Sequence, residues 1–222
     1  MDKPNLIFLF ADQQHWRAVG CVDPHFRTPN WDRFAAQAVR FETTYCTTPL
    51  CSPSRATLMT GLMPHRHGVV NKGVALTRAT IAPLLRRAGY RTAYFGKWHL
   101  RDLPVATDGW DEKQGVCDEY VKPNRPLSDA ETRDFALNFL RRVDDSARPF
   151  AMFASFDEPH GVYWADPAGS YPRDFCEEPP LRDETRLPGS WRESDPDPAV
   201  PRERYLSGSQ RRYWERMGHD ER

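Results

Sequence analysis

The chain of 222 residues carries 31 basic and 31 acidic side chains, and this zero formal net charge gives no overall field that would attract nucleic acid or an anionic membrane. The length and an apolar fraction of 39% predict a folded domain with a core and exclude wholesale disorder. No apolar run reaches membrane-spanning length and the first residues lack the pattern of a signal peptide, so we expect a cytoplasmic protein with no nucleic-acid and no membrane partner.

The first predicted elements are a strand and two helices. Residues 5–11 form a continuous apolar run, which predicts a buried strand of a parallel sheet with Asp12 at its carboxyl end. Thr28 is expected to cap a helix over residues 29–39 that has proline at its first position. The same start signal recurs at Ser52, where a second helix is predicted.

The following elements alternate between helix and strand. A third helix is predicted over residues 80–88 and a strand over residues 90–95. A capping box at residues 128–131 precedes a helix with an apolar stripe, and residues 150–156 form another buried strand. This alternation predicts an α/β fold with a mostly parallel sheet flanked by helices, whose sites lie at the carboxyl ends of the strands.

Beyond Asp157 the composition changes, because prolines and charged residues dominate and few aliphatic side chains stand between them. We therefore divide one domain into residues 1–160, which carry the motifs, and residues 161–222. The second part is interpreted as an extended, proline-rich and charged excursion with an incomplete C-terminus.

The cysteines give little evidence of a framework. An odd number without CxxC spacing argues against disulfide pairing and against a zinc finger. Four of them are interpreted as small apolar packing residues: Cys21, Cys46, Cys117 and Cys176.

Cys51 differs from them because of its neighbours. If Ser52 caps the helix that follows, Cys51 lies beside free backbone amides, whose partial positive charge suits an anion or a thiolate. Arg55 stands one turn along and can reach the same point. A nucleophile with fixed cationic support is what attack on a sulfate or phosphate ester requires.

The segment from Pro49 to Gly61, with the sequence PLCSPSRATLMTG, resembles the signature of the type I sulfatases of the alkaline-phosphatase superfamily at every position. The resemblance implies a fold of that kind and implies that a formylglycine-generating enzyme oxidises Cys51 to formylglycine. One hydroxyl of the hydrated aldehyde would attack sulfur and expel the alcohol. Deprotonation of the second hydroxyl would then release sulfate.

A second signature, the segment Gly89 to His99 with the sequence GYRTAYFGKWH, is similar to the family's as well. By this resemblance Lys97 steadies the formylglycine and the bound anion. His99 would take the proton from the second hydroxyl, which suits a side chain that titrates near neutral pH.

The opening strand is also similar to that of the family, and this implies that Asp12 and the residue at position 51 bind a divalent metal. Calcium is expected before manganese. Many relatives carry a second aspartate where this chain has Gln13, whose amide oxygen can bind a hard cation without adding charge. This departure resembles the branch of choline sulfatase-like and phosphonate monoester hydrolase-like enzymes.

The Pro159-His160 dipeptide resembles the family turn that holds a histidine over the ester oxygen, so His160 is a candidate to protonate the leaving group. His65 and His67 match the family pattern too. They are expected to support the helix that follows Cys51.

The resemblance fades in the proline-rich segment, and no Asp-Asn or Asp-His ligand pair of the kind expected from the family's second half is found. We therefore expect residues 1–160 to be the N-terminal part of a truncated or split sulfatase domain. A homo-oligomer or a complementing C-terminal half would then be its partner.

Three functional hypotheses follow. The first is a formylglycine-dependent hydrolase of small-molecule sulfate monoesters. The second, favoured by Gln13, is a phosphonate monoester or phosphodiester hydrolase with the same nucleophile. The third is an inactive fragment or half of a split enzyme.

Overall fold

The computed structural model describes residues 3–102, 109–114, 129–143 and 148–160 of the chain. One compact unit comprises Met1–Gln13 and Thr43–Pro159, and a second includes Gln14–Glu42. The predicted excursion over residues 161–222 lies outside the described residues, as do Ser128, Cys117 and Cys176.

The first unit is built on a four-stranded parallel sheet with the strand order β1-β6-β3-β5. The α/β fold with a parallel sheet is thus confirmed, as are its three long strands. A second, two-stranded parallel sheet and the short strand β5 carry no pattern that the sequence analysis recognised. The strands are β1 (Leu6–Asp12), β2 (Ala75–Leu76), β3 (Arg91–Gly96), β4 (Arg101–Asp102), β5 (Glu112–Gln114) and β6 (Phe150–Pro159).

The described helices are α1 (Pro29–Ala35), α2 (Cys51–Thr60), α3 (Pro64–His67), α4 (Ile81–Arg87) and α6 (Asp129–Arg142). None of these helices is both long enough and apolar enough to cross a bilayer. α2 is closed by a glycine, Gly61, whose φ of 68° is in the left-handed region that glycine tolerates.

The predicted start of α2 is wrong by two positions. The cap is Leu50, which is extended and whose carbonyl accepts a bond from the amide of Ser54 at 3.0 Å. No side chain caps the helix, and Ser52 lies inside its first turn with only 2% of its surface exposed. Cys51 is therefore the first helical residue rather than a neighbour of the helix, and its own amide is among those without an intrahelical acceptor.

The second unit contains α1, which ends at Ala35 and is thus shorter than the predicted helix. Thr28 occupies the cap position, but its hydroxyl donates to the side chain of Asp32 at 3.0 Å instead of accepting a helix amide. That carboxylate also accepts from the amide of Cys21 at 2.8 Å. These bonds tie the preceding loop to the first turn of α1.

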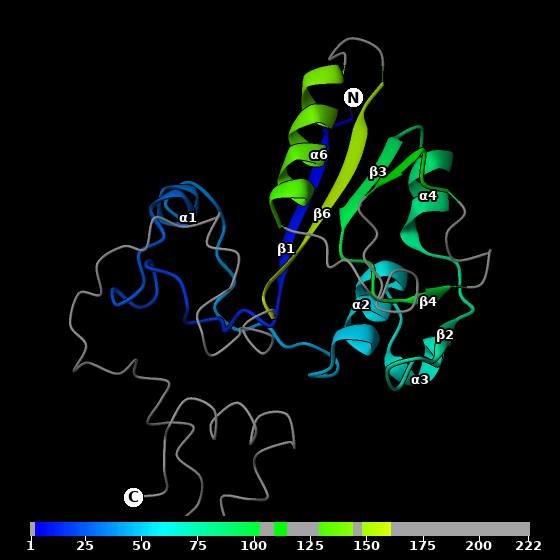
Figure 1. Cartoon of the computed structure of the whole chain (residues 1–222), viewed down its shortest axis with the longest axis horizontal. Helices are drawn as coiled ribbons and strands as arrows, with labels where there is room; N and C mark the ends of the chain where they lie inside the picture. Colours follow the sequence, from blue (N-terminus) through cyan, green and yellow to red (C-terminus); the bar gives the residue numbers. More distant parts are fainter. Residues whose placement is uncertain (1–2, 103–108, 115–128, 144–147, 161–222) are drawn as a thin grey trace, which may run out of the picture. The chain divides into compact units, whose positions relative to one another are not determined.

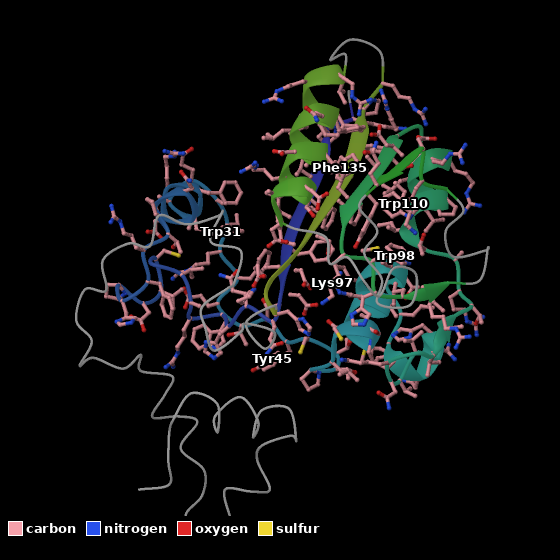
Figure 2. The ribbon with its side chains drawn as sticks, in the orientation of Figure 1. Trp31, Tyr45, Lys97, Trp98, Trp110 and Phe135 are labelled. Carbon is pink, nitrogen blue, oxygen red and sulfur yellow. The ribbon has the colours of Figure 1, made fainter. Side chains whose placement is uncertain are left out.

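Helices cover both faces of the four-stranded sheet, with α6 lying along β6 on one face and α4 beside β3 (Figure 1). The α6 face buries Ala93, Phe95, Ala136, Phe139, Phe150, Met152 and Ala154. The opposite face buries Ala56, Met59, Val69, Leu76, Tyr94, Trp98, Leu100 and Phe153. Figure 2 marks the two sides by Phe135, which packs on the first group, and by Trp98 and Trp110 of the second. Burial on both faces explains why β3 and β6 are continuous apolar runs in the sequence.

The strand predicted over residues 5–11 is present as β1, but the prediction that it is buried is wrong, because β1 lies at the edge of the sheet and most of its residues are exposed. Phe8 stacks on Phe153 with ring centroids 4.6 Å apart, yet 42% of Phe8 remains exposed. Ile7 and Leu9 are about half exposed, at 49% and 54%. Among the described strands β1 pairs with β6 alone, so its second edge and these apolar side chains form an open flank of the sheet.

Candidate active site

Three strands place charged side chains at one end of the sheet. β1 ends at Asp12, β3 is followed directly by Lys97, and Asp157 lies near the end of β6. Because the strands are parallel, their carboxyl ends meet at the same edge, where Lys97 is labelled in Figure 2.

The centre of this group is a set of buried ion pairs. The ammonium of Lys97 lies 2.6 Å from Oδ2 of Asp12 and 2.6 Å from Oδ1 of Asp157. Arg55 brings a second cation to Asp12, with Nη2 at 3.2 Å from Oδ2. Lys97, Asp12 and Arg55 are each less than a tenth exposed. Two carboxylates thus balance two cations, which is what makes charges tolerable at such depth.

Arg55 extends from α2 to the strand ends. Its Nη1 donates to the carbonyl of Lys97 at 2.6 Å and to the hydroxyl of Ser155 at 2.8 Å. The hydroxyl of Tyr94 donates to the same carbonyl at 2.5 Å. The backbone of Lys97 is therefore fixed from two sides, and α2 is locked to β6.

The structure brings Cys51 together with His99, which donates a hydrogen bond to the thiol. Burial raises the pKa of the Cys51 thiol, but the hydrogen bond and charge of His99 and the charge of Lys72 outweigh it. The net result is a pKa below the ordinary value, although the charge of Asp12 opposes this shift. Cys51 is thus held as a reactive thiol close to the ion-pair group.

Alkylation of the unmodified thiol can test this environment. We expect the rate of Cys51 carbamidomethylation to rise with pH, with a midpoint at lower pH than for an ordinary thiol because the pKa of Cys51 is lowered. The variant His99→Asn removes the imidazole ring but keeps a residue that tolerates the left-handed backbone. In this variant the midpoint of the pH dependence of Cys51 alkylation should move to higher pH. Peptide mass spectrometry separates Cys51 from Cys21 and Cys46, and an unchanged midpoint in the variant would contradict the assignment of His99.

The backbone on both sides of the site adopts the left-handed conformation without glycine. Gln13, directly after Asp12, has φ of 65°, and His99 has φ of 53°. Non-glycine residues are uncommon in this region and are concentrated at functional sites, where surrounding contacts hold them. Gln13 directly follows the end of β1, and His99 lies three residues beyond the end of β3.

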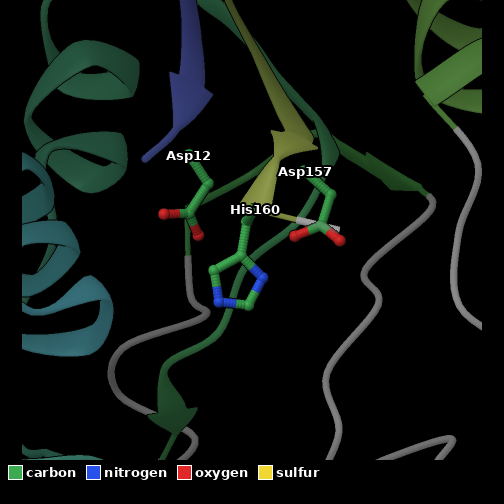
Figure 3. Close-up of side chains that lie close together, drawn as sticks. All are labelled: Asp12, Asp157 and His160. Atoms are coloured by element: carbon green, nitrogen blue, oxygen red, sulfur yellow. The ribbon is translucent and has the colours of Figure 1, made fainter. Parts of the chain in front are cut away.

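The residues that could hold a metal include a group beyond the predicted one. Ligand atoms of Asp12, Asp157 and His160 lie within 4.8 Å of one another, and Figure 3 shows these three side chains converging. Two carboxylates and an imidazole fit a hard divalent cation, although they fill only part of a shell of six or more ligands. Gln13, predicted as a ligand, is exposed.

Asp157 was not singled out from the sequence. The available signal was its place at the end of a predicted buried strand, the same signal that identified Asp12. Its backbone amide and that of Glu158 donate to the carboxylate of Asp129 at 2.7 and 3.1 Å. Burial raises the pKa of Asp129, and these two bonds oppose the shift. The start of α6 thereby holds the end of β6.

His67 supports α2, as expected from the sequence. Its Nδ1 accepts from the amide of Val69 at 3.0 Å, so in the neutral ring Nε2 carries the proton and donates to the hydroxyl of Thr57 at 3.1 Å. Thr57 lies 2.9 Å from the hydroxyl of Thr47. Burial lowers the pKa of His67 and the charge of His65 lowers it further. The network therefore favours a neutral His67.

Replacing His67 with alanine should cost about 2–4 kcal/mol of unfolding free energy, because it removes a buried ring and leaves the amide of Val69 without its acceptor. Since the folded pKa of His67 lies below the unfolded one, its neutral form stabilises the fold above about pH 6.5 and this stability declines as the pH falls. Urea unfolding at pH 7.5 and 5.5 measures both effects. His65→Ala, at an exposed position of the same helix, is the matched control and should change stability by less than about 0.5 kcal/mol.

The interpretation of Cys21 and Cys46 as packing residues is wrong. Both are exposed free thiols, because Cys21 lies in the loop before α1 and Cys46 in the irregular segment before α2. A small side chain in a loop finds no apolar neighbours to pack against.

Comparison with known proteins supplies a family. A model of the family described as sulfatase matches residues 4–210. The chain is 32% identical over 173 residues to an N-acetylglucosamine-6-O-sulfatase of Bacteroides thetaiotaomicron, covering 71% of this chain and 31% of that protein. It is 35% identical over 212 residues to an N-acetylgalactosamine-6-sulfatase of Rattus norvegicus, covering 73% and 40%.

Solved structures agree in fold. The structure of BT4656 in complex with its substrate D-glucosamine-2-N,6-O-disulfate superposes with a TM-score of 0.64 at 29% identity, covering 87% of this chain and 42% of that one. The chain thus spans about a third to two fifths of the length of the relatives it matches.

Proposed function

The chain belongs to the sulfatase family, and on that premise we propose that it hydrolyses sulfate monoesters with residue 51 as the nucleophile. The observation that carries the proposal is the placement of Cys51. It begins a ten-residue helix, is hydrogen-bonded to His99, and lies within the electrostatic reach of Asp12. A nucleophile, a proton acceptor and fixed cations are the groups that such a reaction needs.

Formylglycine at position 51 would supply a hydrated aldehyde, with one hydroxyl to attack sulfur and a second whose deprotonation releases sulfate. His99, whose ring contacts the side chain at position 51, would accept that proton through an unprotonated ring nitrogen. Lys97 and Arg55 contribute the positive charge that an anionic ester requires. His160, directly after β6, is proposed to protonate the leaving oxygen.

Asp12 is the residue best suited to hold the divalent metal, since its carboxylate is buried at the point where the strand ends meet. A bound calcium or manganese ion would neutralise charge on the ester oxygens. It would also change the net charge of the site. Two carboxylates and two cations sum to zero, so a dication makes the site net positive, as a sulfate-binding site should be.

The named relatives narrow the class of substrate. Two of them are described as 6-sulfatases of N-acetylated amino sugars, and a third is in complex with a glucosamine disulfate. We therefore propose a 6-sulfated amino sugar as the natural ester.

The experiment is co-expression with a formylglycine-generating enzyme, followed by peptide mass spectrometry of Cys51 and an assay of sulfate release. We expect conversion of Cys51 and faster release from N-acetylglucosamine 6-sulfate or N-acetylgalactosamine 6-sulfate than from the 4-sulfates. Cys51 left as a thiol would refute the nucleophile. Conversion without turnover by the 222-residue chain would favour the inactive-fragment hypothesis.

Gln13 favours a second candidate, a phosphonate monoester or phosphodiester hydrolase. An amide in place of a carboxylate changes the charge that the site can offer, and charge is the chief difference between sulfuryl and phosphoryl transfer. Parallel assays on nitrophenyl sulfate, a phosphate diester and a phosphonate monoester separate the two. Greater turnover of the phosphonate would reverse our preference.

A further inference from the structure

The buried ammonium of Lys97 pairs with two carboxylates, only one of which also pairs with Arg55. Asp12 and Asp157 each lie 2.6 Å from Nζ, while Asp12 also receives Arg55. The proposed function assigns Asp12 to a divalent cation. A cation on Asp12 would then compete with Lys97 for the same carboxylate and repel the ammonium.

Lys97 nevertheless has to stay in place, because it is only 8% exposed and its backbone is fixed. Its carbonyl receives Arg55 and Tyr94, and its amide donates to the carbonyl of Ser155 at 3.0 Å. An ammonium at that depth without an anionic partner is costly. Asp157 is the carboxylate that remains available.

The geometry points to Asp157 as a positioning residue that holds the Lys97 ammonium while Asp12 is engaged by a divalent cation. This inference rests on the proposed function for the role of Asp12, but the ion pair itself does not depend on turnover. Asp157 is built for this task. Its backbone is clamped by Asp129 at the start of α6, and its side chain is only 30% exposed. Asp129, Asp157 and Lys97 thus form a chain of contacts from a helix terminus into the site.

Lysine acetylation read by peptide mass spectrometry tests the inference without an activity assay. In Asp12→Asn the carboxylate that the cation would occupy is neutral, and we expect Lys97 to be acetylated within about twofold of the wild-type rate because Asp157 still holds it. In Asp12→Asn/Asp157→Asn the rate should rise about tenfold or more, as for a side chain released from its anchor. Equal rates in the two variants overturn the inference.

Addition of saturating Mn²⁺ to the wild-type chain tests the alternative role, in which Asp157 binds the metal instead of holding Lys97. If Asp157 holds Lys97, acetylation of Lys97 stays slow in the wild type and becomes fast in Asp157→Asn. Fast acetylation of Lys97 in the Mn²⁺-treated wild type would instead mean that Asp157 has turned to the metal, and would overturn the inference. If the chain binds no Mn²⁺, the proposed metal site is wrong. The comparison of Asp12→Asn with Asp12→Asn/Asp157→Asn still tests whether Asp157 holds Lys97.

Two controls keep the test specific. Glu112→Gln removes a carboxylate of the outer strand β5, which is 15% exposed and pairs with Arg142 of α6 at 2.8 Å, and should leave Lys97 acetylation at the wild-type rate. Lys113, whose ammonium lies 3.8 Å from the ring centre of Trp98, reports on the fold in every sample. If acetylation of Lys113 becomes faster in the double variant, that variant has partly unfolded. The comparison of Asp157→Asn with the wild type in Mn²⁺ then shows whether Asp157 holds Lys97.

Discussion

Replacing Cys51 with alanine is expected to lower sulfate release by at least about 10³-fold, because loss of the proposed nucleophile would leave only binding and charge stabilisation. Serine at this position should be nearly as damaging, since a plain hydroxyl offers no second hydroxyl for the release of sulfate. The measurement is initial-rate release of sulfate from chains co-expressed with a formylglycine-generating enzyme. The unfolding free energy of both variants should also lie within about 1 kcal/mol of that of the parent, as expected for a partly exposed small side chain.

Cys46→Ala is the matched control, because Cys46 is a free, exposed thiol five positions earlier. Its turnover should equal that of the parent within about twofold. Retention of more than a tenth of the parent rate in Cys51→Ala would show that residue 51 does not attack the ester. Such an outcome would move the search for the nucleophile to other groups at the strand ends.

Replacing Gly96 with alanine is expected to cost about 3–5 kcal/mol of unfolding free energy, enough to unfold much of a marginal domain. Gly96 ends β3 with φ of 94°, and a Cβ at this position would overlap the backbone carbonyl of Ser155 and meet Thr132 of α6 at 2.8 Å. That carbonyl also accepts the amide of Lys97. The added methyl group therefore separates the two strands where the site is assembled.

Gly61→Ala distinguishes the overlap from simple backbone strain. Gly61 also has a left-handed φ, of 68°, but a Cβ there would meet nothing within 4 Å. Its replacement should cost only about 1–2 kcal/mol. Urea unfolding of both variants gives the difference, and equal losses would mean that close approach of β3 and β6 is not what requires Gly96.

The strands β3 and β6 were predictable because burial on both faces makes them continuous apolar runs, and the edge strand β1 carries a run of the same kind although most of its residues are exposed. The apolar runs before Asp12, Lys97 and Asp157 identified the three long strands, and the stripe behind residue 129 identified the helix that covers them. The short strands β2, β4 and β5 hold only two or three residues each. Runs of that length carry no periodicity, and their pairing depends on the tertiary neighbours.

The candidate residues could be named from the sequence, but their contacts could not. The signatures singled out Cys51, Arg55, Lys97 and His99 as candidates, yet a motif does not specify which carboxylate meets which cation. Asp157 lies 60 residues from Lys97 in sequence, and the pairing arises only because β6 lies beside β3. The misplaced cap has a similar origin. The extended backbone of Leu50 starts the helix without any polar side chain, which no capping pattern can indicate.

The central position of β6 sets the order in which the protein can assemble during synthesis. The first strand pairs with β6, which follows it by about 145 residues. β3 also pairs with β6 and cannot do so until β6 has been synthesised. At translation rates of about 5–20 residues per second, the apolar first strand remains unpaired for roughly 7–30 s after it leaves the ribosome. During that interval it is a candidate for chaperone binding and for aggregation. A charged residue in place of exposed Leu9 should therefore raise the soluble yield more than it changes the stability of the finished fold.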